Sequence, residues 1–144
     1  MADDIIRLDA SILSAASVVG YLERQGPIGQ CFDFYDDKKN GGDRFGQDTF
    51  ERAESEMQRI ALNCALGKCG LREERLGAIF AGDLLNQCTS SAYGLLDFDV
   101  PYFGLYGACS TAAEGLLLAG TMVTHGVYET CAAVASSHNC TAER

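Results

Sequence analysis

Short, continuous apolar runs predict three buried strands in the second half of the chain. They occupy residues 77–81, 102–106 and 130–135 and are bounded by glycine, proline or charged residues. Such runs are typical of strands covered on both faces, as in parallel sheets. A partly alternating pattern from Ile5 to Leu13 predicts a further strand at the start of the chain.

The pattern from Asp48 to Leu66 predicts an amphipathic helix. Asp48 stands three residues before Glu51, an arrangement that predicts a capping box, and Gly67 and Gly70 follow as stop signals. The apolar side chains recur at helical spacing and predict one buried face: Phe50, Ala53, Met57, Ile60, Ala61 and Cys64.

Two more helices are predicted between the strands, at 84–96 and at 109–124. The second is apolar nearly all round, with Glu114 as its one charge, and this pattern predicts a helix buried on most sides. Because helices and strands alternate, we expect an α/β fold with a mostly parallel sheet and a buried central helix, formed by residues 1–144 as a single domain.

Composition and charge argue against several classes of partner and binding site. The formal net charge of the 144 residues is -9, which argues against a nucleic-acid partner, since binding to phosphates needs clustered Lys and Arg. No apolar run approaches the roughly 20 residues of a membrane span, and the first residues show no signal-peptide pattern. The seven cysteines include no C-x-x-C pair and only two histidines accompany them, so we expect free thiols and no metal site.

Small and polar residues follow each predicted strand, at Gly82–Asp83, at 107–111 and at 136–139. Because the carboxyl ends of parallel strands meet at one edge of a sheet, these loops are expected to converge on a crevice. Asp83 there suits either a helix cap or a pocket role, and both can hold together.

Cys109 follows a strand and a glycine turn and stands at the predicted start of a helix. A helix N-terminus lowers a thiol pKa and also attracts anions. Cys109 is therefore a candidate nucleophile or a pocket residue, although spacing alone favours a small core cysteine. The histidine best placed to assist is His138, at the end of the last strand.

Several longer strings carry a family resemblance: residues 81–87, residues 107–111, and Ser136 to His138 with the residues after it. The turn at 107–111 resembles the nucleophile elbow of thiolase-like proteins, and the strings together resemble the stage V sporulation protein AD family. That resemblance implies a thiolase-like αβα half and a role in binding dipicolinic acid, with or without calcium. It also implies work with a membrane channel complex during sporulation and germination, at the inner membrane of the spore or forespore.

The resemblance implies ligand-binding roles rather than catalysis for five residues and needs no cofactor: Asp83, Cys109, Ser110, Thr111 and His138. Thiolase-like proteins have two such halves, so this chain is similar to the N-terminal half of a longer protein, and a homodimer is expected. One alternative is an acyltransferase of the thiolase or ketoacyl synthase kind with Cys109 as nucleophile. Another is a half-domain without independent activity.

Overall fold

The computed structural model describes residue 5 and residues 7–38, 43–84 and 88–138. Short 3-10 turns lie at Gly29–Cys31, Glu73–Arg75 and Ala108–Ser110. The helices are α1 (Tyr21–Arg24), α2 (Phe50–Cys69), α3 (Thr89–Gly94) and α4 (Thr111–Thr124). The strands are β1 (Val18–Val19), β2 (Phe34–Tyr35), β3 (Ala78–Gly82), β4 (Tyr102–Gly104) and β5 (Cys131–Ala135).

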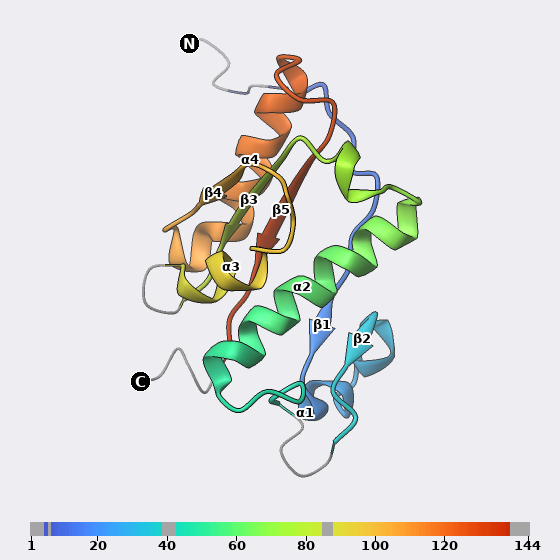
Figure 1. Ribbon diagram of the computed structural model, residues 1–144. Coiled ribbons are helices and arrows are strands. Elements are labelled where there is room, and N and C mark those ends of the chain that lie inside the picture. The colour runs from blue at the N-terminus through green and yellow to red at the C-terminus, as the bar shows by residue number, and fades with distance from the viewer. Residues whose placement is uncertain (1–4, 6, 39–42, 85–87, 139–144) are drawn as a thin grey trace.

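Three parallel strands form the main sheet in the order β4-β3-β5 (Figure 1). The three predicted runs became these strands, and the predicted α/β fold with parallel pairing is confirmed. Only β3 is buried as predicted, since Phe103 of β4 is 42% exposed and β5 is half-buried. The central strand β3 pairs on both sides and is buried throughout. Its continuous apolar sequence therefore reflects helix cover on both faces.

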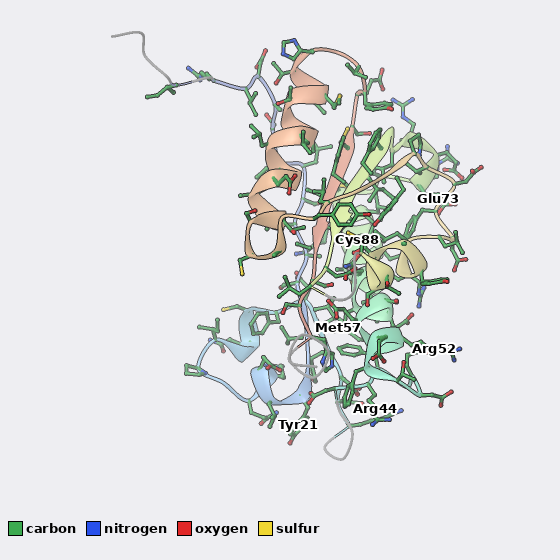
Figure 2. All side chains as sticks on the ribbon, turned by 90° about the vertical axis from the view of Figure 1, so that its left-hand side faces the viewer. Tyr21, Arg44, Arg52, Met57, Glu73 and Cys88 are labelled. Carbon is green, nitrogen blue, oxygen red and sulfur yellow. The ribbon has the colours of Figure 1, made fainter. Side chains whose placement is uncertain are left out.

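Helices lie on both faces of this sheet, with α4 on one side and α2 and α3 on the other (Figures 1 and 2). Successive side chains of β3 point to opposite faces. Ile79 and Ala81 join a core with Leu62 and Leu66 of α2, whereas Ala78 and Phe80 join a core with Ala119 of α4.

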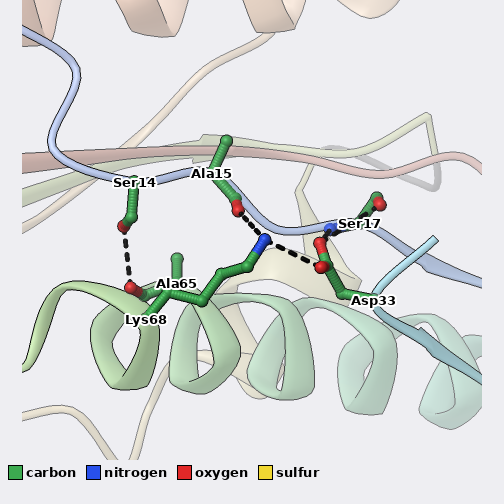
Figure 3. A network of polar contacts seen from close by, with 6 residues as sticks. All are labelled: Ser14, Ala15, Ser17, Asp33, Ala65 and Lys68. Carbon is green, nitrogen blue, oxygen red and sulfur yellow. Dashed lines mark hydrogen bonds and ion pairs between the residues drawn. The ribbon is translucent and has the colours of Figure 1, made fainter. Parts of the chain in front are cut away.

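The predicted strand at 5–13 is wrong for its described residues. They have no regular secondary structure, and the first strand, β1, pairs with β2 in a separate two-stranded parallel sheet. Residues 7–17, here called the N-terminal arm, contact α4 through Leu8, beside Gly120, and then reach α2, where side chains hold residues 14–17 (Figure 3). Ser14 donates to Ala65 O at 2.7 Å, and Lys68 Nζ donates to Ala15 O at 2.7 Å. Without a neighbouring strand to pair with, an alternating pattern alone does not make a strand.

The helix predicted at 48–66 exists, but its ends and buried face differ from the prediction. Thr49, not Asp48, is the N-cap, and its hydroxyl accepts from Arg52 N at 3.2 Å. Gly67 lies inside the helix, whereas Gly70 ends it with a φ of 67°. The buried residues of α2 share only Ala53 with the predicted face and otherwise follow a different stripe: Ala53, Glu54, Gln58, Leu62 and Leu66.

The two remaining predicted helices are also corrected. In the region predicted as helix 84–96, α3 is short, and residues 85–87 lie outside the described part of the chain. The helix predicted from Cys109 begins at Thr111, after a 3-10 turn. It is not buried on most sides: among its side chains, Leu116 is 55% and Leu117 58% exposed. One face of α4 packs on the sheet, and no described element covers the other.

No helix in the described ranges combines the length and the apolar character that crossing a bilayer requires.

Candidate functional site

The turn that carries Cys109 is shaped by close contacts. Ala108 adopts a φ of 48°, a left-handed conformation that is uncommon and strained for a residue with a side chain. Just before it, a Cβ at Gly107 would lie 2.4 Å from Glu114 Oε2 and 2.7 Å from Ser110 Oγ, so a larger residue there would require these side chains to move. The turn closes with Ser110 N donating to Gly107 O at 2.9 Å, and it leaves Cys109 exposed at the surface.

An open depression of about 590 Å³ adjoins this turn. Its wall combines two polar side chains with glycines, small residues and two exposed large ones: Gly104, Tyr106, Gly107, Ser110, Ala113, Glu114 and Leu117. The Ser110 hydroxyl donates to Gly107 O and does not cap the helix. The first turn of α4 therefore opens toward solvent beside an apolar wall.

Thr111 connects the start of α4 to the carboxyl end of β3. It is buried, and its methyl carbon would lie 2.8 Å from a Cβ at Gly82. Its hydroxyl oxygen is buried and has no hydrogen-bond partner among the described residues. A buried hydroxyl without a partner is costly, and a ligand-binding role for Thr111 stays a prediction.

Asp83 follows β3 directly and is also buried. Its Oδ2 accepts from Ser91 N at 2.7 Å and from Ser91 Oγ at 2.5 Å, in the first turn of α3. Asp83 thus accepts from the first turn of α3, but the N-cap of that helix is Cys88, so the predicted cap of a helix starting at residue 84 is corrected. Both Asp83 and Thr111 adjoin Gly82, and the structure brings these two predicted residues together.

A buried polar network that the sequence interpretation missed lies next to Asp83. Gln58 of α2 donates through Nε2 to Ser136 Oγ at 2.7 Å, to Ser91 Oγ at 3.0 Å and to Gly82 O at 3.3 Å. Ser136 in turn donates to Glu54 Oε1 at 2.6 Å. Glu54 and Gln58 share the four-residue spacing of Leu62 and Leu66, which was the available signal, but polar side chains do not register in an apolar pattern.

His138 lies against the start of α2. Its Nε2 is 2.7 Å from Asp43 O, and its ring centroid is 5.1 Å from that of Phe50. Since a carbonyl oxygen only accepts, Nε2 carries the proton and donates it. Asn139, the last residue of the predicted polar loop, is outside the described residues.

Two thiols near this edge of the sheet, Cys88 and Cys109, differ in their exposure to solvent. Cys88 is buried, and its Sγ donates to Leu105 O at 2.8 Å. Desolvation raises the pKa of Cys88, so this thiol stays neutral, whereas Cys109 is open to solvent. Burial likewise raises the pKa of Tyr102 to about 12, with the nearby Cys88 as the next contribution.

Comparison with known proteins gives two findings. A family model described as "Stage V sporulation protein AD (SpoVAD)" matches residues 5–144. The chain is also 36% identical over 131 residues to "Stage V sporulation protein AD" of Bacillus subtilis (strain 168). These aligned residues cover 91% of this chain but only 38% of that relative. These matches support a role in sporulation and a spore-related location. The chain belongs to the stage V sporulation protein AD family.

Proposed function

We propose that the chain forms part of a non-enzymatic protein that binds dipicolinic acid during sporulation and germination. The observation that carries this proposal is the first turn of α4, where the N-cap residue Ser110 makes no capping bond and which opens into the depression beside Ser110. A dicarboxylate would be attracted by the positive end of this 14-residue helix and by hydrogen-bond donors around it. Ser110 supplies a hydroxyl group at the wall of the depression, and the Thr111 hydroxyl lies buried one residue further along the chain.

Charge in the depression bears on the form of the ligand. The Glu114 carboxylate belongs to the wall and would repel a free dianion. Calcium prefers carboxylate and carbonyl oxygens, and a calcium ion carried by the ligand would turn this repulsion into attraction. The calcium complex of dipicolinate is therefore the preferred ligand under this proposal.

The same proposal extends to partners and to the larger protein. The chain spans 38% of the curated relative that it matches, and the outer face of α4 carries exposed leucines. We take the chain as a thiolase-like half-domain whose α4 face packs against a second copy or the remainder of a longer chain. The assembled protein is proposed to work with a membrane channel complex, at the periphery of the inner spore membrane.

A second candidate is acyl transfer with Cys109 as nucleophile. It is favoured by the exposure of Cys109 and by the strained Ala108 before it. Thiol catalysis also needs a base or another means of activation. The Nε2 proton of His138 is committed to Asp43 O, and His125 follows the opposite end of α4. The binding role therefore has the stronger support.

A titration separates the two candidates. The protein is titrated with dipicolinate, with and without calcium, and separately incubated with acyl-CoA, followed by intact-mass measurement. We expect saturable dipicolinate binding that Cys109→Ala weakens and Cys31→Ala leaves unchanged, because Cys31 is an equally exposed thiol in another part of the fold. An acyl adduct on Cys109 that turns over would overturn the binding role in favour of the enzyme.

A further inference from the structure

We propose that Gln58 is a positioning residue: it holds the carboxyl end of β3 in place and, through Gly82, sets the first turn of α4. The members of the buried polar network are Glu54, Gln58, Asp83, Ser91 and Ser136. This inference rests on the proposed function only for its ligand-binding consequence. The structural coupling stands on contacts alone.

The location of Gln58 is unusual for a polar side chain. It is 1% exposed, and on the same stripe of α2 the next two positions are Leu62 and Leu66. A leucine or methionine would fill the space without the cost of desolvating an amide. A buried polar group that is hydrogen-bonded instead fixes one arrangement of its neighbours.

The hydrogen bonds define one orientation of the amide. Since Gly82 O only accepts, the group that faces it is Nε2, whose two hydrogens are shared among three acceptors. Gln58 Oε1 is buried and has no hydrogen-bond partner among the described residues. Each serine hydroxyl that receives from Gln58 donates onward to a carboxylate, Ser136 to Glu54 and Ser91 to Asp83. The donors therefore run outward from Gln58 in both directions, and the arrangement joins α2 to α3 and to the ends of β3 and β5.

Gly82 transmits this arrangement to the candidate site. A Cβ on Gly82 would lie 2.4 Å from Leu105 O and 2.8 Å from the Thr111 methyl carbon. The last residue of β3 thus touches both the segment before the Cys109 turn and the first residue of α4. A small displacement of Gly82 is passed to both, because close-packed contacts leave no room to absorb it.

The test compares Gln58→Leu with Leu62→Ala, a variant one turn along the same buried stripe that lowers stability without touching the network. The readout is the alkylation rate of Cys109 relative to Cys31 in the folded protein, measured by peptide mass spectrometry. Both thiols are exposed, so Cys31 is an internal reference. We expect the ratio to change by about threefold or more in Gln58→Leu, because thiol reactivity follows its local setting, and to stay unchanged in Leu62→Ala.

Hydrogen exchange supplies a second readout. The backbone amides at 110–113 are expected to exchange about tenfold faster in Gln58→Leu than in the unaltered protein. The exchange rates of the β5 amides serve as a control, and they are expected to change by the same factor in Gln58→Leu as in Leu62→Ala. Ser136→Ala, which keeps the Gly82 and Ser91 contacts of Gln58, is expected to act in the same direction with a smaller effect. It also replaces Gln58→Leu if that variant does not fold.

An unchanged Cys109 to Cys31 ratio in both network variants, or an equal change in Leu62→Ala, overturns the positioning role. Dipicolinate affinity is measured on the same samples and should fall with the network variants only. If the unaltered protein binds no dipicolinate, the proposed function fails, but the alkylation ratio still decides the role of Gln58.

Discussion

The two faces of the main sheet differ in what covers them. On one face, α2 and α3 enclose a core that includes Leu62, Ile79 and Phe98, and even polar side chains such as Gln58 are buried there. On the other face, α4 is richer in apolar residues, yet only Thr111, Gly115 and Ala119 are buried. The more apolar helix is thus the more exposed one.

This difference shows that burial is decided by neighbours and not by the hydrophobicity of a helix. α2 has the sheet on one side, α3 beside it and the N-terminal arm along it, so most directions around it are occupied. Among the described residues, α4 packs on the sheet and is touched elsewhere by Leu8 of the N-terminal arm, beside Gly120, so more of its surface stays open. Apolar residues on an open face fit the proposal that another surface packs against α4.

The largest effect is expected on the enclosed face. Leu62→Ala removes a side chain that is 4% exposed in the core, and we expect unfolding free energy to fall by about 3 kcal/mol. Urea unfolding followed by circular dichroism measures this change. A loss below about 1 kcal/mol would mean that this face is loosely packed after all.

A smaller effect is expected from the helix caps. Thr49→Ala removes the hydroxyl that accepts from Arg52 N and should cost about 1 kcal/mol. Ser110→Ala is the matched change at α4, where the side chain does not cap, and should cost less than about 0.5 kcal/mol. Equal losses of stability in Thr49→Ala and Ser110→Ala would contradict the difference in capping between α2 and α4.

The matched leucine on the open face is expected to matter less still. Leu117→Ala keeps a strong helix former at a position that is 58% exposed, so stability should change by less than about 0.5 kcal/mol. If the α4 face binds a second copy, the same variant lowers the mass seen by light scattering at high concentration. A large stability loss in a monomeric sample would show that the face is covered within the chain.

The smallest effect on stability is expected from the polar contacts of Asp33 with Lys68 and with Ser17 of the N-terminal arm. A hydrogen bond from Lys68, at 2.7 Å, lowers the pKa of Asp33 from its ordinary value of 3.8, and Ser17 N adds to it. A lowered pKa stabilises the fold above pH 3.8, and this contribution is lost as the pH falls through the folded value. The stability difference between the native protein and Asp33→Asn should thus stay constant from neutral pH to about pH 5 and shrink below about pH 4. A difference that grows in acid would contradict this assignment.

The candidate site was only partly readable in the sequence. The glycine turn and the start of α4 are local features, and the positions of Cys109, Ser110 and Thr111 followed from them. Asp83 was placed correctly at the end of β3, but its partner Ser91 was not, because that contact depends on how α3 folds back. Gln58 and Glu54 gave no apolar signal, and their importance appears only where α2 meets the strand ends.

From α2 onward, the order of strands and helices and the parallel α/β class were determined by the sequence, since a continuous apolar run suits a strand in a parallel sheet wherever it occurs. The helix turn at Cys109 was determined in the same local way. Only the tertiary structure decided that residues 7–17 form an arm instead of a strand, that polar residues of α2 are buried, and that the apolar α4 is open. Each of these depends on which surfaces meet, and contacts between residues far apart in the chain are not encoded in any local pattern.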